Sequence, residues 1–257
     1  MTRLTNKTAL ITGAGAGIGA AAAMLFCKEG AAVTLVDADA SALERTTQAI
    51  LNEWPNAKVN HYTANVADEA QALAAVQHCI DAFGGLDILV NNAAIRNYSA
   101  VADAKPEEWH AIVGVNLVGS ANYCRAALPA LRRSGQGSIV NVSSCYAVAG
   151  RKGMGLYDAT KAAQLALTRT LAFEESAHGV RANAVCPGST LTDFHVGRAQ
   201  AGGKDVEQLK TERKDTSLIG RWATPEEIAW PILWLASSEA SFITGTTLMV
   251  DGGLSIM

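Results

Sequence analysis

Tyr157 and Lys161 are a pair of residues whose types and spacing could do chemistry together. They stand four residues apart, so a helix would place both side chains on one face. A phenol with a pKa of about 10 is a weak base at neutral pH, and a nearby ammonium group favours tyrosinate and lowers that pKa. Such a pair alone is more often a surface coincidence than a catalytic site. Ser143 and Ser144 favour the catalytic interpretation, because they end an apolar stretch, and parallel sheets bind ligands at the carboxyl edge of their strands.

A second group of residues suits the binding of a phosphate. The segment Thr12–Gly19 has glycine at positions 13, 15, 17 and 19 and follows an apolar stretch directly. Glycine lets the backbone turn sharply and lets a pyrophosphate approach the amide groups at a helix N-terminus. Asp37 stands eighteen residues after Gly19, near the spacing at which an acidic residue binds the adenosine ribose of a dinucleotide.

The charge of Asp37 favours NAD over NADP. A carboxylate accepts hydrogen bonds from the 2′- and 3′-hydroxyls of the ribose but repels a 2′-phosphate. The glycine loop has no basic residue, and Ala38 follows the aspartate. The alternative role of Asp37, as a helix N-cap, is weaker because Ser41 is placed to fill it.

These residues need elements that hold them, and short apolar stretches alternate with longer amphipathic ones along the chain. The predicted strands are Thr8–Thr12, Ala32–Asp37, Lys58–Thr63, Ile88–Asn91, Ser138–Ser143, Arg181–Cys186 and Thr247–Asp251. The predicted helices are Ile18–Lys28, Ser41–Asn52, Asp68–Phe83, Pro106–Arg132, Leu156–Ala177 and Pro225–Ala236. This alternation predicts an α/β fold, a doubly wound seven-stranded parallel sheet with helices on both faces, in one domain over residues 1–257. The least regular segment, 188–224, is a candidate substrate lid.

Composition excludes several other classes of protein. The chain has 257 residues, an apolar fraction of 49% and a formal net charge of −3, so it is neither disordered nor strongly basic. No basic run is longer than Arg132-Arg133, and we expect no nucleic-acid partner. The five cysteines form no C-x-x-C pair, which favours reduced thiols in the cytoplasm and no metal site. The uncharged segment Thr8–Cys27 could be a membrane helix, but alternating glycines disfavour that alternative.

Taken together, these motifs resemble those of the short-chain dehydrogenase/reductase family over essentially the whole chain. The motifs that carry the resemblance are Thr12-Gly13-x-x-x-Gly17-Ile18-Gly19, Asn91-Asn92-Ala93-Ala94, Ser144 thirteen residues before Tyr157, Tyr157-x-x-x-Lys161, Pro187-Gly188-x-x-x-Thr192 and Val250-Asp251-Gly252-Gly253. Two positions depart from the family pattern. Ala94 stands where the family usually has glycine, and Asn65-Val66 stands where an aspartate usually contacts adenine.

The resemblance implies a Rossmann fold that binds NAD(P). The cofactor residues that it implies are Gly13, Gly15, Ala16, Gly17, Ile18, Gly19, Asp37, Asn65, Val66, Asn92, Ala93, Tyr157, Lys161, Pro187, Gly188, Thr190 and Thr192. It also implies a homotetramer, for which the long helices predicted at 106–132 and 156–177 could supply a self-complementary face.

The resemblance further implies the roles of four catalytic residues. Ser144 would donate a hydrogen bond to the reacting oxygen, and Tyr157 would exchange a proton with it. Lys161 would lower the pKa of Tyr157 and bind the nicotinamide ribose, while Asn116 would hold a water in a proton relay. The implied reaction interconverts a secondary alcohol and a ketone by hydride transfer.

The substrate side is less specific in sequence. The residues that we expect to line it are Arg96, Ser144, Cys145, Tyr146, Arg151, Met154 and His195. The basic residues among them, Arg96, Arg151 and His195, could bind a carboxylate or the hydroxyls of a sugar. Basic side chains in loops are, however, more often solvated surface charges. We therefore expect a small polar alcohol or ketone, such as a sugar, a polyol or a hydroxy acid.

Two alternatives remain at this point. One is a 3-oxoacyl-carrier-protein reductase, which Asp37 disfavours, as does His178 where such reductases tend to place an arginine for the acidic carrier. The other is a catalytically silent dinucleotide sensor or scaffold with the same fold. That alternative predicts a broken serine, tyrosine or lysine, and all three are intact.

Overall fold

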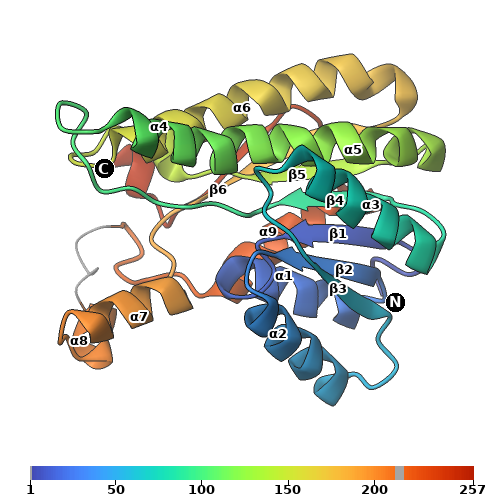
Figure 1. The fold of residues 1–257 in the computed structure, drawn as a ribbon, viewed down its shortest axis with the longest axis horizontal. Coiled ribbons are helices and arrows are strands. Elements are labelled where there is room, and N and C mark those ends of the chain that lie inside the picture. The colour runs from blue at the N-terminus through green and yellow to red at the C-terminus, as the bar shows by residue number, and fades with distance from the viewer. Residues whose placement is uncertain (1, 212–216) are drawn as a thin grey trace.

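Seven parallel strands form one sheet in the computed structural model, which describes residues 2–211 and 217–257 (Figure 1). The strands are β1 Thr8–Thr12, β2 Ala32–Asp37, β3 Val59–Thr63, β4 Ile88–Asn91, β5 Ser138–Val142, β6 Arg181–Pro187 and β7 Thr247–Val250. Their order across the sheet is β3-β2-β1-β4-β5-β6-β7. The chain reverses its direction of winding between β1 and β4, which is where a doubly wound sheet opens a crevice for a ligand.

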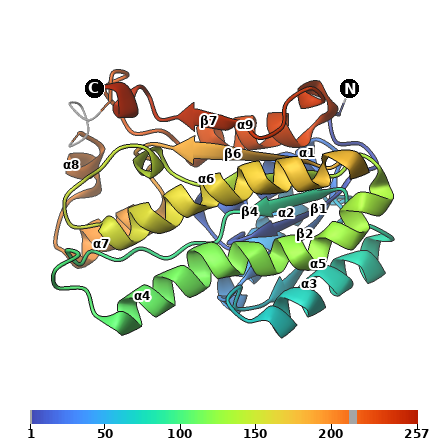
Figure 2. The ribbon, with the colours of Figure 1, turned by 90° about the horizontal axis from the view of Figure 1, so that it is seen from above.

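Helices cover both faces of this sheet. They are α1 Gly17–Lys28, α2 Ala40–Glu53, α3 Glu69–Phe83, α4 Pro106–Val113, α5 Gly119–Ser134, α6 Gly155–Glu175, α7 Asp193–Ala201, α8 Val206–Thr211 and α9 Pro225–Ala236. Buried side chains of α1 and α9 pack on one face, and those of α3, α5 and α6 pack on the other. Figure 2 shows α5 and α6 running alongside each other, with α7 and α8 beyond the carboxyl ends of the strands.

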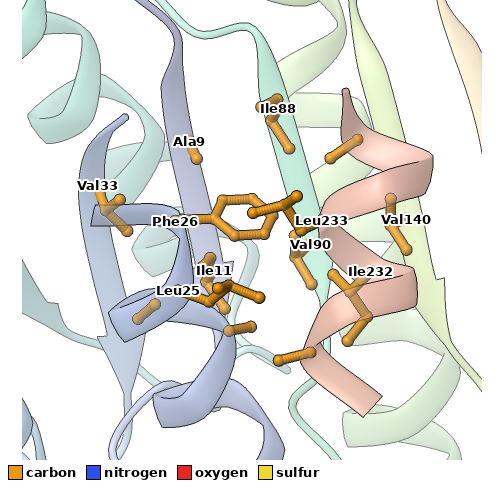
Figure 3. Close-up of a cluster of buried hydrophobic side chains, with 14 of the residues drawn as sticks. Ala9, Ile11, Leu25, Phe26, Val33, Ile88, Val90, Val140, Ile232 and Leu233 are labelled. Carbon is orange, nitrogen blue, oxygen red and sulfur yellow. The ribbon is translucent and has the colours of Figure 1, made fainter. Parts of the chain in front are cut away.

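The central strands are apolar on both sides because helices cover both sides of them. All five residues of β1 are buried, and so are the first five of β2. Phe26 of α1 is fully buried and lies among side chains of β1, β4 and α9, including Ile11, Val90 and Leu233 (Figure 3). This packing fixes α1 against the sheet, and with it the glycine loop that leads into α1.

Most predicted elements are confirmed, and two predictions are wrong. The helix predicted at 106–132 is interrupted by a π-helical turn, Gly114–Val118, between α4 and α5. The N-cap of α2 is Asp39, whose carboxylate accepts a hydrogen bond from the backbone N–H of Ala42, whereas Ser41 lies inside the helix. The predicted lid, 188–224, contains the two short helices α7 and α8, and its residues 212–216 lie outside the described residues.

The uncharged segment Thr8–Cys27 is no membrane helix, because it forms β1, the glycine loop and most of α1. Throughout residues 2–211 and 217–257, each helix is too short or too polar to cross a membrane.

Candidate active site at the carboxyl edge of the sheet

A cavity of about 780 Å³ opens at the carboxyl edge of the strands, where β1 and β4 meet. It is lined by every predicted cofactor residue except Gly15 and Gly19. A second cavity, of about 470 Å³, shares Gly188 with the first and is otherwise lined by Ser189 and by residues within 217–227 and 249–253. None of the predicted catalytic residues lines it. The sequence therefore brings the predicted cofactor residues together from five strands at one edge.

The glycine loop leaves no room for side chains. A Cβ at Gly13 would lie 2.8 Å from the Ala93 Cα, and one at Gly15 would lie 3.0 Å from Oδ2 of Asp37. Gly13 and Gly17 also have positive φ angles of +65° and +56°, which favour glycine. The side-chain amide of Asn92 donates to the carbonyl oxygens of Thr12 and Gly13, both at 3.0 Å, and so ties the loop to the end of β4.

The residues at this loop fit a dinucleotide. The backbone N–H of Gly17, the first residue of α1, donates to the carboxylate of Asp193 at 3.2 Å. The N–H groups at the start of a helix can donate to a phosphate in the same way as they donate to this carboxylate. The sequence analysis missed Asp193, which becomes visible only when α7 is placed beside the start of α1.

Asp37 lies between the loop and the end of β2. Its carboxylate accepts hydrogen bonds from the backbone N–H groups of Gly15 at 3.0 Å and Asp39 at 3.1 Å. No Lys or Arg in the described ranges forms an ion pair with this carboxylate, which lines the cavity. Asn65 lines the same cavity, and its side-chain oxygen accepts from the backbone N–H of Ala67 at 3.1 Å.

Tyr157 and Lys161 come from the first turns of α6, and Ser144 follows β5. The tyrosine is 6% exposed and the lysine 1% exposed, and the Lys161 Nζ lies 5.6 Å from the centre of the Tyr157 ring. The Ser143 hydroxyl donates to the Lys161 carbonyl at 2.8 Å, which joins the end of β5 to α6. Ser144 begins a short turn and accepts from the backbone N–H of Tyr146 at 3.2 Å.

Burial sets the ionisation of both groups. It raises the pKa of Tyr157 above its usual value, against the opposing effects of the Arg96 and Arg151 guanidinium groups and a hydrogen bond with Ser144. Burial and the charge of Arg96 lower the pKa of Lys161 to about 7. The expectation of a lowered tyrosine pKa is therefore wrong for this structure, because the loss of solvation outweighs the nearby positive charges.

Asn116 lies in the π-helical turn and is fully buried. Its side-chain amide donates to the Ile95 carbonyl and to the Thr160 hydroxyl, both at 3.0 Å. Its backbone carbonyl accepts from the side-chain amide of Gln164 at 2.7 Å. The sequence analysis missed Gln164, for which the signal was a polar residue one helical turn after Lys161 on the same buried face.

Only one of the predicted substrate residues lines the cavity. Arg96 does so, and its Nη1 lies 3.0 Å from Nε2 of His195. Arg151 does not line the cavity; it forms an ion pair with Asp158 at 2.9 Å, and its guanidinium carbon lies 3.8 Å from the centre of the Tyr146 ring.

Cys145 and Met154 are buried side chains beside the site. Burial raises the pKa of the Cys145 thiol to about 11, which disfavours the nucleophilic thiolate form. Within the part of the chain that the structure describes, no group of three or more His, Cys, Asp and Glu residues could hold a metal ion.

Comparisons with known proteins agree with this architecture. A family model described as "Enoyl-(Acyl carrier protein) reductase" matches residues 13–255. The 3-oxoacyl-acyl-carrier-protein reductase of Thermotoga maritima is 37% identical over 258 residues, which cover 99% of this chain and 100% of that protein. The 2-(S)-hydroxypropyl-CoM dehydrogenase 3 of Xanthobacter autotrophicus is 38% identical over 253 residues, 98% of each chain.

A solved structure shows the same fold. The ligand-free aldohexose dehydrogenase of Thermoplasma acidophilum superimposes with a TM-score of 0.89 at 34% sequence identity, covering 100% of this chain and 96% of that one. The family match, the two relatives and the parallel sheet with its cavity lead to one conclusion: this chain belongs to the short-chain dehydrogenase/reductase family and is an oxidoreductase.

Proposed function

We propose that this enzyme interconverts a secondary alcohol and a ketone, with Ser144, Tyr157 and Lys161 as its catalytic residues and NAD as its preferred cofactor. The observation that carries the proposal is the burial of Tyr157 beside Lys161 in the cavity that the glycine loop also lines. Non-enzymatic binding of a dinucleotide would not require these two side chains to line the same cavity.

The cofactor would lie along the line from Asp37 past the N-terminus of α1 to Lys161 and the loop after β6. Because Gly13 and Gly17 have no side chains, the cofactor could come close to the backbone of the loop. Its ribose hydroxyls would donate to the carboxylate of Asp37. When bound, the nicotinamide group supplies the acceptor or the donor of the hydride. The negative charge of Asp37 would repel a 2′-phosphate, which supports NAD over NADP.

The chain's own residues would handle the proton. Ser144 would donate a hydrogen bond to the substrate oxygen, and Tyr157, as tyrosinate, would take the hydroxyl proton during oxidation. The positive charges of Arg96 and Arg151 lower the pKa of Tyr157 and so favour tyrosinate. Oxidation needs the deprotonated form of Tyr157, and reduction needs its protonated form.

The substrate that we favour is small and polar: a sugar, a polyol or a hydroxy acid. Arg96 supports this choice, because no carboxylate in the described part of the chain forms an ion pair with it and it lines the cavity. The aldohexose dehydrogenase is named for a sugar, and the hydroxypropyl-CoM dehydrogenase is named for another small alcohol. The Thermotoga relative favours a second candidate, a 3-oxoacyl-carrier-protein reductase.

We further propose one domain over residues 1–257, with 188–224 as the lid over the substrate. All five cysteines are buried free thiols, which supports a reducing, cytoplasmic location. The family resemblance supports a homotetramer.

The test is a panel of purified alcohols and ketones assayed with NAD and NADP, with Tyr157→Phe beside the wild type. We expect oxidation of a small polar alcohol with NAD. The Tyr157→Phe variant should lose a factor of about 10²–10⁴ in kcat, because general base catalysis contributes that much, while it still binds NADH by fluorescence. Activity restricted to 3-oxoacyl thioesters with NADPH would select the second candidate, and near-native activity of Tyr157→Phe would refute the catalytic site.

A further inference from the structure

Gln164 connects two residues of the catalytic region from inside the fold. It is fully buried, and its side-chain oxygen accepts from the Lys161 Nζ at 3.1 Å. Its side-chain nitrogen donates to the Asn116 carbonyl at 2.7 Å and to the Ser120 hydroxyl at 2.9 Å. One amide therefore bridges α6 to the π-helical turn between α4 and α5.

The orientation of this amide is fixed by its neighbours. The Lys161 ammonium can only donate, and the Asn116 carbonyl can only accept. Rotating the amide by 180° would place two donors against each other at Lys161 and two acceptors against each other at Asn116. The oxygen of Gln164 must therefore face the lysine.

Lys161 needs such acceptors, because its ammonium group has almost no contact with solvent. One of its three protons is donated to the Val142 carbonyl at 2.8 Å and a second to Gln164. The third is then free to be donated into the cavity that Lys161 lines. Two fixed acceptors on the inner side thus aim the remaining N–H bond outward.

We propose that Gln164 is a positioning residue, which holds Lys161 protonated and aimed at the cavity. Its amide nitrogen is anchored on the Asn116 carbonyl and the Ser120 hydroxyl, so its amide oxygen stays turned toward the lysine.

The charged and titratable groups that face Lys161 come from three elements. Arg96, after β4, lowers the pKa of Lys161, and the Cys186 thiol of β6 raises it. Tyr157, one turn earlier on α6, is the partner in proton transfer. Gln164 carries no charge, so its contribution is a hydrogen bond that stabilises the ammonium form.

The test follows the titration of the Lys161 Nζ itself, by NMR of enzyme labelled with ¹⁵N-lysine. The signal is assigned by its loss in Lys161→Met. In Gln164→Met the ammonium loses one acceptor while the side-chain volume is kept, and we expect its midpoint to fall by about one to two pH units. In Gln164→Glu a carboxylate faces the ammonium, and we expect its midpoint to rise.

Ser120→Ala is the matched control. It removes a partner of the Gln164 nitrogen but leaves the bonds to Lys161 and Asn116, so the midpoint should stay at the wild-type value. A Lys161 midpoint that is unchanged in both Gln164 variants would overturn the proposal, as would a fall in both. A generally loosened fold would not move the two variants in opposite directions.

The kinetic consequence rests on the proposed function. With Gln164→Met, kcat for alcohol oxidation at pH 7 should fall about tenfold, because fewer molecules carry the ammonium group. The affinity for NADH should change less than kcat. The NMR titration needs neither cofactor nor substrate, so the proposal for Gln164 and the proposed reaction can fail separately.

Discussion

Tyr157 and Lys161 respond to the same burial in opposite directions. Loss of solvation disfavours the charged form of each group, so the pKa of the tyrosine rises while that of the lysine falls to about 7. Lys161 is therefore only partly protonated at neutral pH. The ammonium form depends on the acceptors Val142 and Gln164, and the tyrosinate form depends on Arg96 and Arg151. The two groups are close enough that a pH profile would report the pair.

The single side chain of Asp37 predicts the choice between NAD and NADP. In Asp37→Ser the carboxylate that would accept from the ribose is lost, and with it the repulsion of a 2′-phosphate. We expect the affinity for NADH to fall about 10- to 100-fold, the value of a hydrogen bond to a charged group, and the ratio of NADPH to NADH affinity to rise. Fluorescence titration of both cofactors measures this.

The matched control is Asp39→Ser, which removes a neighbouring carboxylate but keeps an N-cap for α2. Its affinities should stay near those of the wild type. Tighter binding of NADPH than of NADH by the wild type would contradict the role assigned to Asp37.

The apolar stretches of the sequence predicted the bounds of the strands well. The charge pattern and the apolar periodicity predicted where helices begin and end less well. The bounds of β1, β2 and β4 agree with the prediction, because these strands are buried on both sides. The π-helical turn at 114–118 was not predictable from periodicity, because it depends on contacts between distant segments. A Cβ at Gly119 would lie 2.8 Å from the Val66 side chain, and Val66 belongs to the segment after β3.

The site shows the same division between local and tertiary signals. Spacing indicated Tyr157 and Lys161 as candidates, and the end of a predicted strand indicated Ser143 and Ser144. The resemblance to the family then singled out Ser144. The direction of the tyrosine pKa shift could not be predicted in this way, because it depends on burial by elements far apart in sequence. Gln164 and Asp193 acquire their partners only when α6 meets the π-helical turn and when α7 meets α1.

The contact between α7 and α1 predicts competition with the cofactor. Asp193 places a carboxylate on the first amide of α1, where a phosphate would bind. In Asp193→Asn this negative charge is removed, and we expect NADH to bind about two- to fivefold more tightly, the effect of one charge at a helix terminus. Fluorescence titration at low and high salt measures it, and the gain should shrink with salt.

Asp205→Asn is the control for this variant. Asp205 lies before α8, and its carboxylate accepts from the backbone N–H of Glu207, away from α1. Weaker NADH binding by Asp193→Asn than by Asp205→Asn would show that Asp193 supports the cofactor site and does not compete with it.

At the scale of the whole molecule, the two edges of the sheet differ from its centre. All four residues of β7 are only half-buried, whereas the central strands are buried throughout. Phe242 precedes this edge strand and is fully exposed, and Ile256 follows it with 79% of its surface exposed. Exposed apolar side chains along a strand edge are typical of a surface that another chain covers.

These exposed side chains predict that the edge of the sheet at β7 is an interface between subunits of the proposed homotetramer. Burial of a large apolar side chain contributes about 1.5–3 kcal/mol, so Phe242→Ser should weaken association about 10- to 100-fold for each copy buried. Sedimentation velocity over a range of micromolar concentrations should show the variant dissociating where the wild type remains assembled. Leu73→Ser is the control, because Leu73 is a half-exposed leucine on α3, which packs on the opposite half of the sheet. A wild type that is monomeric at these concentrations, or equal dissociation of both variants, would exclude β7 as the interface.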